Sequence, residues 1–254
     1  MLKISKISFK KKKFFIENGV VVFKKIIPRK IINECLNELS KFKDITIVKN
    51  SDDIVFDSYK SKKYIKYFQF LNFYMNSFNK ILNLKIFEIS SFLLGEQTYF
   101  LNMGYHNKIP GGSETPPHQD NFYWCRAYPK KALTAYVALN SQSKINGGIT
   151  YYLKSHKLKT LQHESSKVKA FSSFLNQKTI IDNKIHLKKI FSPVLEPGDI
   201  VFHHCNIIHK AEKNNHRTAE RKALALTMYS INSKTDSNLH KKYLKNRNKY
   251  SKYN

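Results

Sequence analysis

The sequence predicts a mainly β protein, a sandwich or barrel with flanking helices. From about Glu96 onward, short apolar segments alternate with turn signals such as KIPGG, NGG and EPGD, which is typical of many short strands. Before that point, apolar residues recur at helical spacing. The 254 residues include 41 % hydrophobic and 13 % aromatic residues, so the chain can bury a substantial core without disulfides.

The first part of the chain predicts a helical layer that begins with one strand. Residues 19–27 are short and β-branched, which favours a strand. Pro28 then opens a segment with apolar positions at helical spacing, namely Ile31, Ile32, Cys35, Leu36 and Leu39. Residues 62–94 are dense in aromatic and aliphatic residues at mixed spacing, which predicts one or two buried helices. We therefore expect residues 1–95 to form a helical N-terminal layer.

The rest of the chain predicts the β core. Strands are expected at 98–106, 132–140, 149–153, 190–195, 200–204 and 222–231. Residues 158–190 interrupt this pattern with polar, lysine-rich sequence, which predicts an insertion over one mouth of the barrel. We expect residues 96–231 to form the core and residues 232–254 a Lys- and Asn-rich tail, partly helical or frayed. The absence of a clear linker or repeat predicts one domain over residues 1–254.

The formal charge of +27 has two interpretations. A strongly basic chain can bind a polyanion such as nucleic acid. However, only five of the 45 basic residues are arginines, whose bidentate contacts nucleic-acid sites favour. Lysine, isoleucine and asparagine are abundant together, which is typical of codon bias in an AT-rich genome. We therefore expect no specific nucleic-acid partner.

The cysteines and the apolar runs predict a cytoplasmic protein. Cys35, Cys125 and Cys205 are odd in number and have neither CxxC nor disulfide-ladder spacing, so reduced thiols are expected. The basic N-terminal segment has no apolar stretch of signal-peptide length. No apolar run is long enough to span a membrane.

The segment TPPHQDNFYW carries the first candidate metal ligands. Two prolines favour an extended approach to His118. Side chains two apart on an extended segment share a face, so His118 and Asp120 can reach one metal. The later run GDIVFHHCNIIHK offers His203, His204 and His209 as a third ligand. Two histidines and one carboxylate form the facial triad of non-haem iron(II) oxygenases, and zinc is the alternative metal.

The sequence resembles the phytanoyl-CoA dioxygenase family of iron(II)- and 2-oxoglutarate-dependent oxygenases. The matching pieces are PPHQDNFYW, LTAYVALN followed by NGGITYYLKSHK, and PGDIVFHHCNIIHKAEKNNHRTAERKALALTMY, within roughly residues 95–230. The resemblance implies a double-stranded β-helix, also called a jelly-roll or cupin-like fold. It implies His118, Asp120 and His209 as the ligands of Fe(II), with 2-oxoglutarate and O2 as co-substrates. It assigns the 2-oxoglutarate carboxylate to Arg221, with Arg217 as the competitor.

Further positions follow from the same resemblance. Asn102 matches an amide that contacts 2-oxoglutarate, and Tyr136 lies where relatives often carry tryptophan against the co-substrate. Residues that flank the ligands and are candidates to face substrate are Gln119, Asn121 and Tyr123. Ala211 is a departure, because relatives often place Ser or Thr there to assist the arginine.

The expected function is hydroxylation of a small organic molecule, with decarboxylation of 2-oxoglutarate to succinate. Related halogenases carry a small residue where this chain has Asp120, so the carboxylate favours hydroxylation. Desaturation, cyclisation or demethylation by the same enzyme class is one alternative. A basic nucleic-acid-binding protein on an inactive cupin-like scaffold is the other. The sequence predicts neither the substrate nor the oligomeric state.

Overall fold

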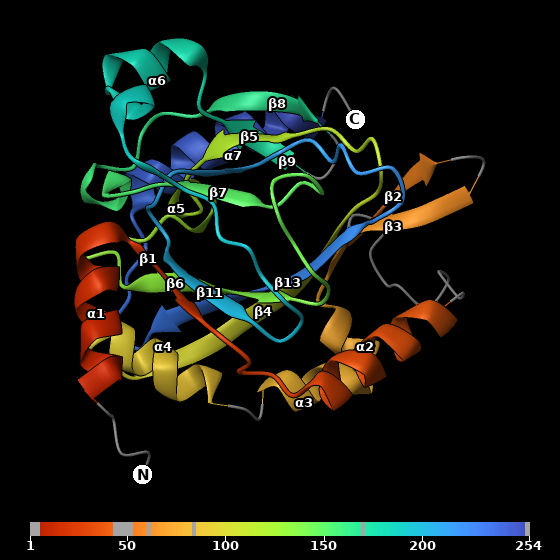
Figure 1. Ribbon diagram of the computed structural model, residues 1–254. Helices are drawn as coiled ribbons and strands as arrows, with labels where there is room; N and C mark the ends of the chain where they lie inside the picture. Colours follow the sequence, from red (N-terminus) through yellow and green to blue (C-terminus); the bar gives the residue numbers. More distant parts are fainter. Residues whose placement is uncertain (1–5, 43–52, 60–61, 83–84, 169–170, 252–254) are drawn as a thin grey trace.

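A computed structural model of the chain describes residues 6–42, 53–59, 62–82, 85–168 and 171–251 (Figure 1). Two antiparallel sheets lie face to face, and helices cover the outer side of the larger one. This arrangement confirms the predicted class, a mainly β jelly roll with flanking helices. The inner faces of the two sheets enclose the candidate site.

The larger sheet has seven described strands in the order β1-β11-β6-β13-β4-β3-β2. Their bounds are β1 Val20–Phe23, β2 Ile54–Tyr59, β3 Lys62–Gln69, β4 Thr98–Lys108, β6 Ala132–Ala138, β11 Ile200–His204 and β13 Arg221–Ser230. The longest strands, β4 and β13, pair with each other in the middle of this sheet. Every residue of β6 is buried because β6 lies between β11 and β13 and is covered on both faces.

The smaller sheet has the order β10-β7-β12-β5, and a separate hairpin, β8-β9, lies beside it. Its strands are β5 Thr115–His118, β7 Ile149–Tyr152, β10 Ile190–Phe191 and β12 His209–Ala211, and the hairpin strands are β8 Glu164–Val168 and β9 Phe171–Phe174. Pro116 and Pro117 lie in β5, which is an edge strand. Proline is tolerated at an edge because it need not donate a hydrogen bond to a second neighbour.

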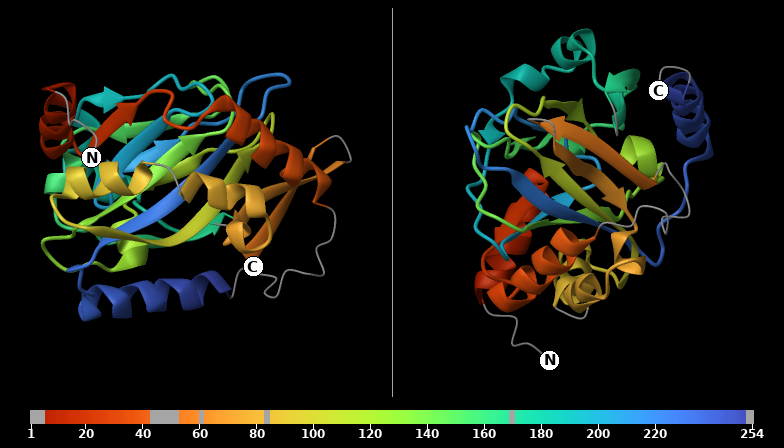
Figure 2. Two further views of the ribbon diagram at one scale, coloured as in Figure 1. Left: turned by 90° about the horizontal axis from the view of Figure 1, so that it is seen from below. Right: turned by 90° about the vertical axis from the view of Figure 1, so that its right-hand side faces the viewer.

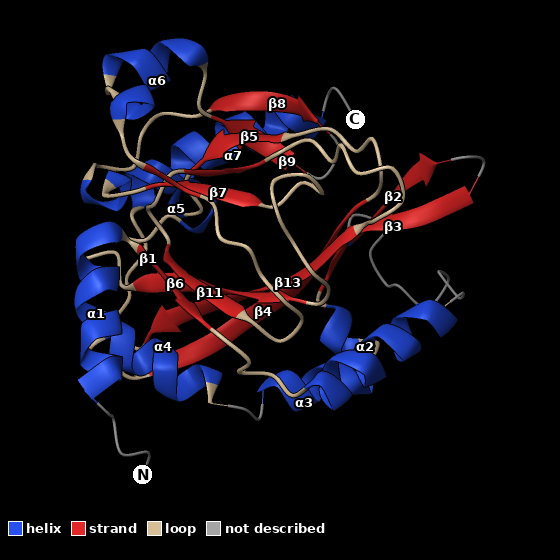
Figure 3. Ribbon diagram, in the orientation of Figure 1, coloured by secondary structure: helices blue, strands red, loops and turns tan. Residues whose placement is uncertain are grey.

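The helices α1 to α4 cover the side of the larger sheet that faces away from the smaller one, and α5, α6 and α7 lie near the smaller sheet and the hairpin (Figure 3). The bounds are α1 Lys6–Asn18, α2 Arg29–Lys41, α3 Asn79–Leu82, α4 Ile86–Leu94, α5 Asn121–Trp124, α6 Gln177–Asp182 and α7 Ser237–Ser251, with short 3-10 turns at Leu71–Phe73, Asn76–Phe78, Ser155–Lys157 and Ile185–Leu187. The main hydrophobic core lies between the outer face of the larger sheet and the helices α2, α3 and α4. None of the described helices is long and apolar enough to cross a bilayer.

The prediction that residues 62–94 are helical is wrong for their first part. Residues Lys62–Gln69 form β3, which pairs with β4 through Tyr67 and Phe68. Aromatic residues fit a half-buried strand as well as a helix, so the pairing with β4 decides the outcome. The predicted helices follow later as α3 and α4, and the predicted helix after Pro28 is confirmed as α2.

The predicted insertion at 158–190 holds the β8-β9 hairpin and α6, and it lies beyond the smaller sheet (Figure 1). The tail that was expected to be partly helical contains α7. This helix runs along one side of the molecule (Figure 2) and packs against α5, β8 and β9. The insertion and the tail therefore meet at the end of the barrel where the HxD segment lies.

The turn Gly198-Asp199, which precedes β11, is hydrogen-bonded to the segment 24–27 that follows β1. The carbonyl of Gly198 accepts hydrogen bonds from the backbone N–H groups of Ile26 and Ile27, at 2.9 and 3.0 Å. The Asp199 carboxylate accepts from the Lys25 N–H at 2.9 Å and from Lys24 Nζ at 2.8 Å. These hydrogen bonds fix where β11 begins, and thereby the position of His203, four residues after Asp199.

We expect Gly198→Ala to destabilise the protein by about 3 kcal/mol. Gly198 has φ +89°, which costs an L-residue roughly 1–2 kcal/mol, and a Cβ there would overlap the Ile27 carbonyl oxygen at a further cost of roughly 1–3 kcal/mol. Chemical denaturation measures the change. Gly111→Ala is the matched control, because Gly111 has φ +76° with no atom within 4 Å of an added Cβ. An equal loss of unfolding free energy in both variants would contradict the expected overlap with the Ile27 carbonyl.

Candidate metal centre

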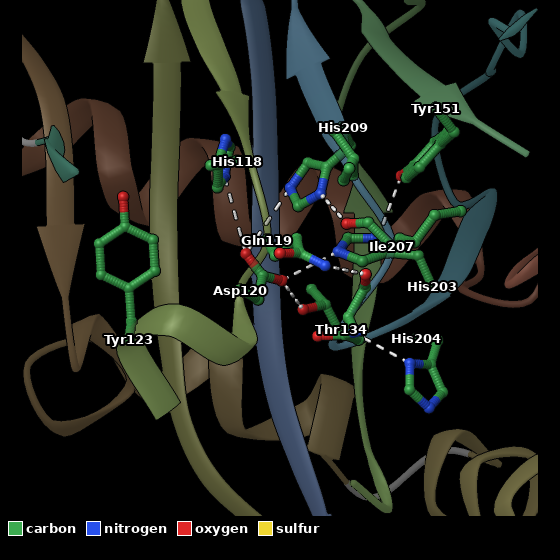
Figure 4. A network of polar contacts seen from close by, with 12 residues as sticks. His118, Gln119, Asp120, Tyr123, Thr134, Tyr151, His203, His204, Ile207 and His209 are labelled. Carbon is green, nitrogen blue, oxygen red and sulfur yellow. Dashed lines mark hydrogen bonds and ion pairs between the residues drawn. The ribbon is translucent and has the colours of Figure 1, made fainter. Parts of the chain in front are cut away.

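The strands bring His118, Asp120 and His209 together between the two sheets (Figure 4). His118 ends β5 and His209 begins β12, and these two residues are direct register partners. Asp120 follows β5 after one residue. One ligand atom from each of the three side chains lies within 4.8 Å of the others. Their grouping matches the triad that the sequence predicts.

Both histidines are held in the tautomer that a metal requires. His118 Nδ1 lies 2.9 Å from the Pro116 carbonyl, and His209 Nδ1 lies 3.1 Å from the Ile207 carbonyl. A carbonyl can only accept, so each Nδ1 carries the proton and each Nε2 keeps its lone pair. The Nε2 atoms of His118 and His209 lie 3.7 and 3.6 Å from Asp120 Oδ1.

Burial sets the charges of these groups. Burial holds the pKa of His118 well below its ordinary value, and the neighbouring His209 lowers it further. Burial likewise lowers the pKa of His209 to about 4, although Asp120 opposes this shift. Burial alone would raise the pKa of Asp120, but the surrounding His209 and His203 hold it below its ordinary value. Two neutral imidazoles and one carboxylate are the donor set that a divalent cation needs.

The second oxygen of Asp120 is bound by the larger sheet. Thr134 Oγ1 donates to Asp120 Oδ2 at 2.7 Å, and His203 Nε2 lies 3.1 Å from the same oxygen. Tyr151 of the smaller sheet places its hydroxyl 3.0 Å from His203 Nδ1. Thr134 and Tyr151 were not predicted as site residues. A polar residue within an apolar strand such as LTAYVA was the available signal for Thr134.

The three candidate histidines for the last position have different surroundings. His209 joins the triad, and His203 contacts the far side of the Asp120 carboxylate. His204 lies on the other face of β11, where its Nδ1 accepts from the Asn206 N–H at 3.1 Å and its ring lies near Phe15. Of the three candidates, only His209 joins His118 and Asp120 in the group of possible metal ligands, and His203 and His204 of β11 do not.

Arg221 begins β13 on the inner face and is 6 % exposed, whereas Arg217 is exposed in the preceding loop. Asn214 anchors this loop, with its Nδ2 3.0 Å from the Lys108 carbonyl and 2.9 Å from the Ala219 carbonyl. The Nε atom of Arg221 is buried and has no hydrogen-bond partner among the described residues. A buried, unpartnered guanidinium donor fits an anionic ligand such as the distal carboxylate of 2-oxoglutarate.

The inner face of β4 and β13 beside Arg221 carries small residues together with His106, the register partner of Ala223. Gly104 and Ala225 are register partners there, and Ala223 lies between Ala225 and Arg221. Ala225 is half-buried although its strand lies in the middle of the sheet, whereas the side chains of Tyr67 and His106 cover Gly104.

Two residues expected near the co-substrate also lie on this inner face. Tyr136 is 5 % exposed, and its hydroxyl donates to Gln142 Oε1 at 2.9 Å. Burial raises the pKa of Tyr136, while the nearby Arg221 guanidinium partly opposes the shift. Asn102 is half-buried and belongs to a cross-strand row of the larger sheet that contains His203, Thr134, Thr227 and Asn102.

Gln119 and Asn121, expected to face substrate, instead tie the HxD segment to the insertion. Both are fully buried. Gln119 Oε1 accepts from the Leu161 N–H at 2.8 Å, and its Nε2 donates to the Asn206 carbonyl at 2.8 Å. Asn121 Nδ2 donates to Thr160 Oγ1 at 2.8 Å. Both amides are occupied by the chain, so we assign them to anchoring the insertion and no longer propose them as substrate contacts.

Aromatic side chains border the triad on the side of His118. The Phe171 ring of β9 lies 4.7 Å from the His118 ring, and the Tyr123 ring lies 6.1 Å from it. The Tyr123 hydroxyl donates to the Ser173 carbonyl of the same hairpin at 2.6 Å. Figure 4 shows Tyr123 beside His118, on the side away from His203. Tyr123 therefore stays a candidate for substrate contact.

Comparisons with known proteins agree with this geometry. The family model described as Phytanoyl-CoA dioxygenase (PhyH) matches residues 15–223. No curated protein matches the sequence.

Several solved structures share the fold. EctD from S. alaskensis with 2-oxoglutarate and 5-hydroxyectoine has 17 % identity and a TM-score of 0.71, over 89 % of this chain and 77 % of that chain. The epimerase SnoN in complex with Fe3+, alpha ketoglutarate and nogalamycin RO has 17 % identity and a TM-score of 0.69, over 90 % and 86 %. The carbocyclase SnoK from nogalamycin biosynthesis has 18 % identity and a TM-score of 0.69, over 92 % and 87 %.

The buried Lys108 beside Arg221 predicts a pH-dependent stability. Burial, assisted by the charge of Arg221, lowers the pKa of Lys108 to about 6. The unfolded chain holds this proton up to about pH 10, so it binds more protons than the folded state between these values. Wild type should therefore gain stability relative to Lys108→Met as pH rises from about 6 to about 9, by up to about 1.4 kcal/mol per pH unit.

Denaturation at several pH values measures this difference. Lys178→Met, at a largely exposed lysine of α6, is the control and should track wild type. A wild-type curve parallel to that of Lys108→Met would contradict the depressed pKa.

Proposed function

Because the chain belongs to the phytanoyl-CoA dioxygenase family, we propose that it is an iron(II)- and 2-oxoglutarate-dependent oxygenase that hydroxylates a small organic molecule. The observation that carries this proposal is the meeting of two neutral imidazoles and one ionised carboxylate on the smaller sheet, opposite the face of the larger sheet that carries the buried Arg221. The group contains nitrogen and oxygen donors and no cysteine, a donor set that suits iron(II).

In this proposal, His118, Asp120 and His209 hold Fe(II). The bound metal supplies activation of O2, coupled to conversion of 2-oxoglutarate into succinate and CO2. The carbonyl acceptors at Pro116 and Ile207 keep both histidine Nε2 atoms free at neutral pH. The site residues thus bind the metal without first losing a proton.

Arg221 binds the distal carboxylate of 2-oxoglutarate. Its buried, unpartnered Nε provides a donor that no group of the described chain satisfies. The planar guanidinium offers two parallel hydrogen bonds, which the single ammonium of lysine cannot imitate. Tyr136 and Asn102 flank the path from Arg221 to the triad, and we propose them as co-substrate contacts.

Hydroxylation is favoured over halogenation because this chain has the Asp120 carboxylate at the position where related halogenases carry a small residue. The same enzyme class also performs other oxidations, and the similar structures include proteins named as an epimerase and a carbocyclase. Desaturation, cyclisation, demethylation or epimerisation is therefore the second candidate. The mass of the product separates them, since hydroxylation adds one oxygen atom to the substrate. We propose a cytoplasmic enzyme with no specific nucleic-acid partner.

Replacement of a triad residue should abolish turnover of 2-oxoglutarate. The protein is loaded with Fe(II) and 2-oxoglutarate without oxygen and then exposed to O2, and succinate is quantified. We expect succinate formation by His118→Ala and Asp120→Ala to fall at least about 100-fold, because each variant loses one of the three side chains proposed to bind the metal. His186→Ala, at an exposed histidine of the insertion, is the matched control. Succinate formation at the wild-type rate in Asp120→Ala would exclude the proposed site.

Arg221→Lys should weaken 2-oxoglutarate binding about 10- to 100-fold, because one bidentate, charge-assisted contact is worth about 1.5–3 kcal/mol. Calorimetric titration of the metal-loaded protein with 2-oxoglutarate measures the dissociation constant. Arg217→Lys should bind like wild type, since Arg217 is exposed. The reverse pattern would assign the co-substrate to Arg217.

A further inference from the structure

We propose that His203 is a positioning residue that holds the Asp120 carboxylate as a one-oxygen ligand of the metal. This inference rests on the proposed function, because it takes Asp120 to be a metal ligand. It assigns a role to a third buried histidine, which the triad itself does not use. His203 lies on β11 and is 2 % exposed.

The two oxygens of Asp120 have separate surroundings. Oδ1 faces the Nε2 atoms of His118 and His209, at 3.7 and 3.6 Å. Oδ2 is contacted by Thr134 Oγ1 at 2.7 Å and by His203 Nε2 at 3.1 Å. Figure 4 shows the two oxygens of Asp120 with separate contacts, one toward His118 and His209 and the other toward His203 and Thr134. The carboxylate therefore presents one oxygen to the metal site and one to the larger sheet.

His203 and Thr134 reach the same oxygen because they are register partners on adjacent strands, β11 and β6. Side chains of paired residues project to the same face, so both point from the larger sheet toward the smaller one. Asp120 follows β5 of the smaller sheet, so the two contacts cross the space between the sheets. They fix the rotation of the carboxylate relative to the sheet opposite.

The direction of each hydrogen bond is set by the partners. An ionised carboxylate only accepts, so His203 Nε2 carries the proton and donates it to Asp120 Oδ2. The other ring nitrogen of His203, Nδ1, lies 3.0 Å from the Tyr151 hydroxyl of the smaller sheet. The Asp120 carboxylate thus fixes the proton on Nε2, and the contact with Tyr151 helps to hold the orientation of the His203 ring.

One-oxygen binding by Asp120 matters for this reaction. Three protein ligand atoms leave three adjacent positions, and the two donor atoms of 2-oxoglutarate together with O2 need all three. If Asp120 bound through both oxygens, it would occupy one of these positions. Two hydrogen bonds to Oδ2 oppose this, because Oδ2 would have to leave His203 and Thr134 to reach the metal.

The test uses the full chain with Co(II) as the probe metal, in titrations without oxygen that yield the dissociation constant and the absorption spectrum of the bound ion. In His203→Phe, which keeps the ring and removes the donor, we expect Co(II) to bind about 10- to 100-fold more weakly, with an altered spectrum. His203→Gln can still donate to Oδ2 and should restore both the affinity and the spectrum. Tyr151→Phe should give a smaller loss, because it removes only the partner of Nδ1.

His204→Phe is the matched control. His204 is the next residue of the same strand, faces away from Asp120, and should bind Co(II) like wild type with an unchanged spectrum. Wild-type affinity and spectrum in a folded His203→Phe would overturn the inference. If His203→Phe does not fold, equal binding by Tyr151→Phe and wild type, or a loss in His203→Gln, would overturn it instead. Failure of wild type to bind Co(II) would refute the proposed metal site, a result distinct from failure of the positioning role.

Discussion

The structure around the site depends on a buried negative charge at Asp120, because a carboxylate removed from water is costly unless it is paired and hydrogen-bonded. Four neighbours meet this requirement, two from each side. His118 and His209 approach Oδ1, while Thr134 and His203 contact Oδ2. The first pair comes from the smaller sheet and the second pair from the larger sheet. The facing of the two sheets is therefore what makes the charge tolerable and the metal centre possible.

The larger sheet supports this arrangement through β11, which carries His203 between β1 and β6. The Asp199 carboxylate and the Gly198 carbonyl join the start of β11 to the segment that follows β1. The N-terminal part of the chain thus contributes more than a covering layer of helices. It supplies the edge strand against which β11 is aligned, and this alignment sets where His203 meets Asp120.

The insertion and the tail complete the site from the other end. Gln119 and Asn121 are held by residues at the start of the insertion, so the residues on either side of Asp120 are fixed by it. Phe171 of the β8-β9 hairpin packs against His118, and α7 packs against that hairpin. The insertion and the C-terminal helix α7 therefore border the side of the triad where Tyr123 lies.

The sequence alone predicted the fold class and the pairing of His118 with Asp120, and the family resemblance pointed to the arginine at the start of the last strand. These features are local, since alternation in a strand and a spacing of two residues depend only on neighbours in the chain. Tertiary structure decided the rest. The spacing in HHCNIIH by itself left three histidines open, and the family resemblance pointed to His209; the register of β12 against β5 gives the physical reason, because it places His209 opposite His118. Residues 62–69 became a strand because β4 offered a free edge. The roles of Thr134, His203 and Tyr151 arise only where two sheets face each other, because cross-strand and cross-sheet contacts join residues that are distant in sequence.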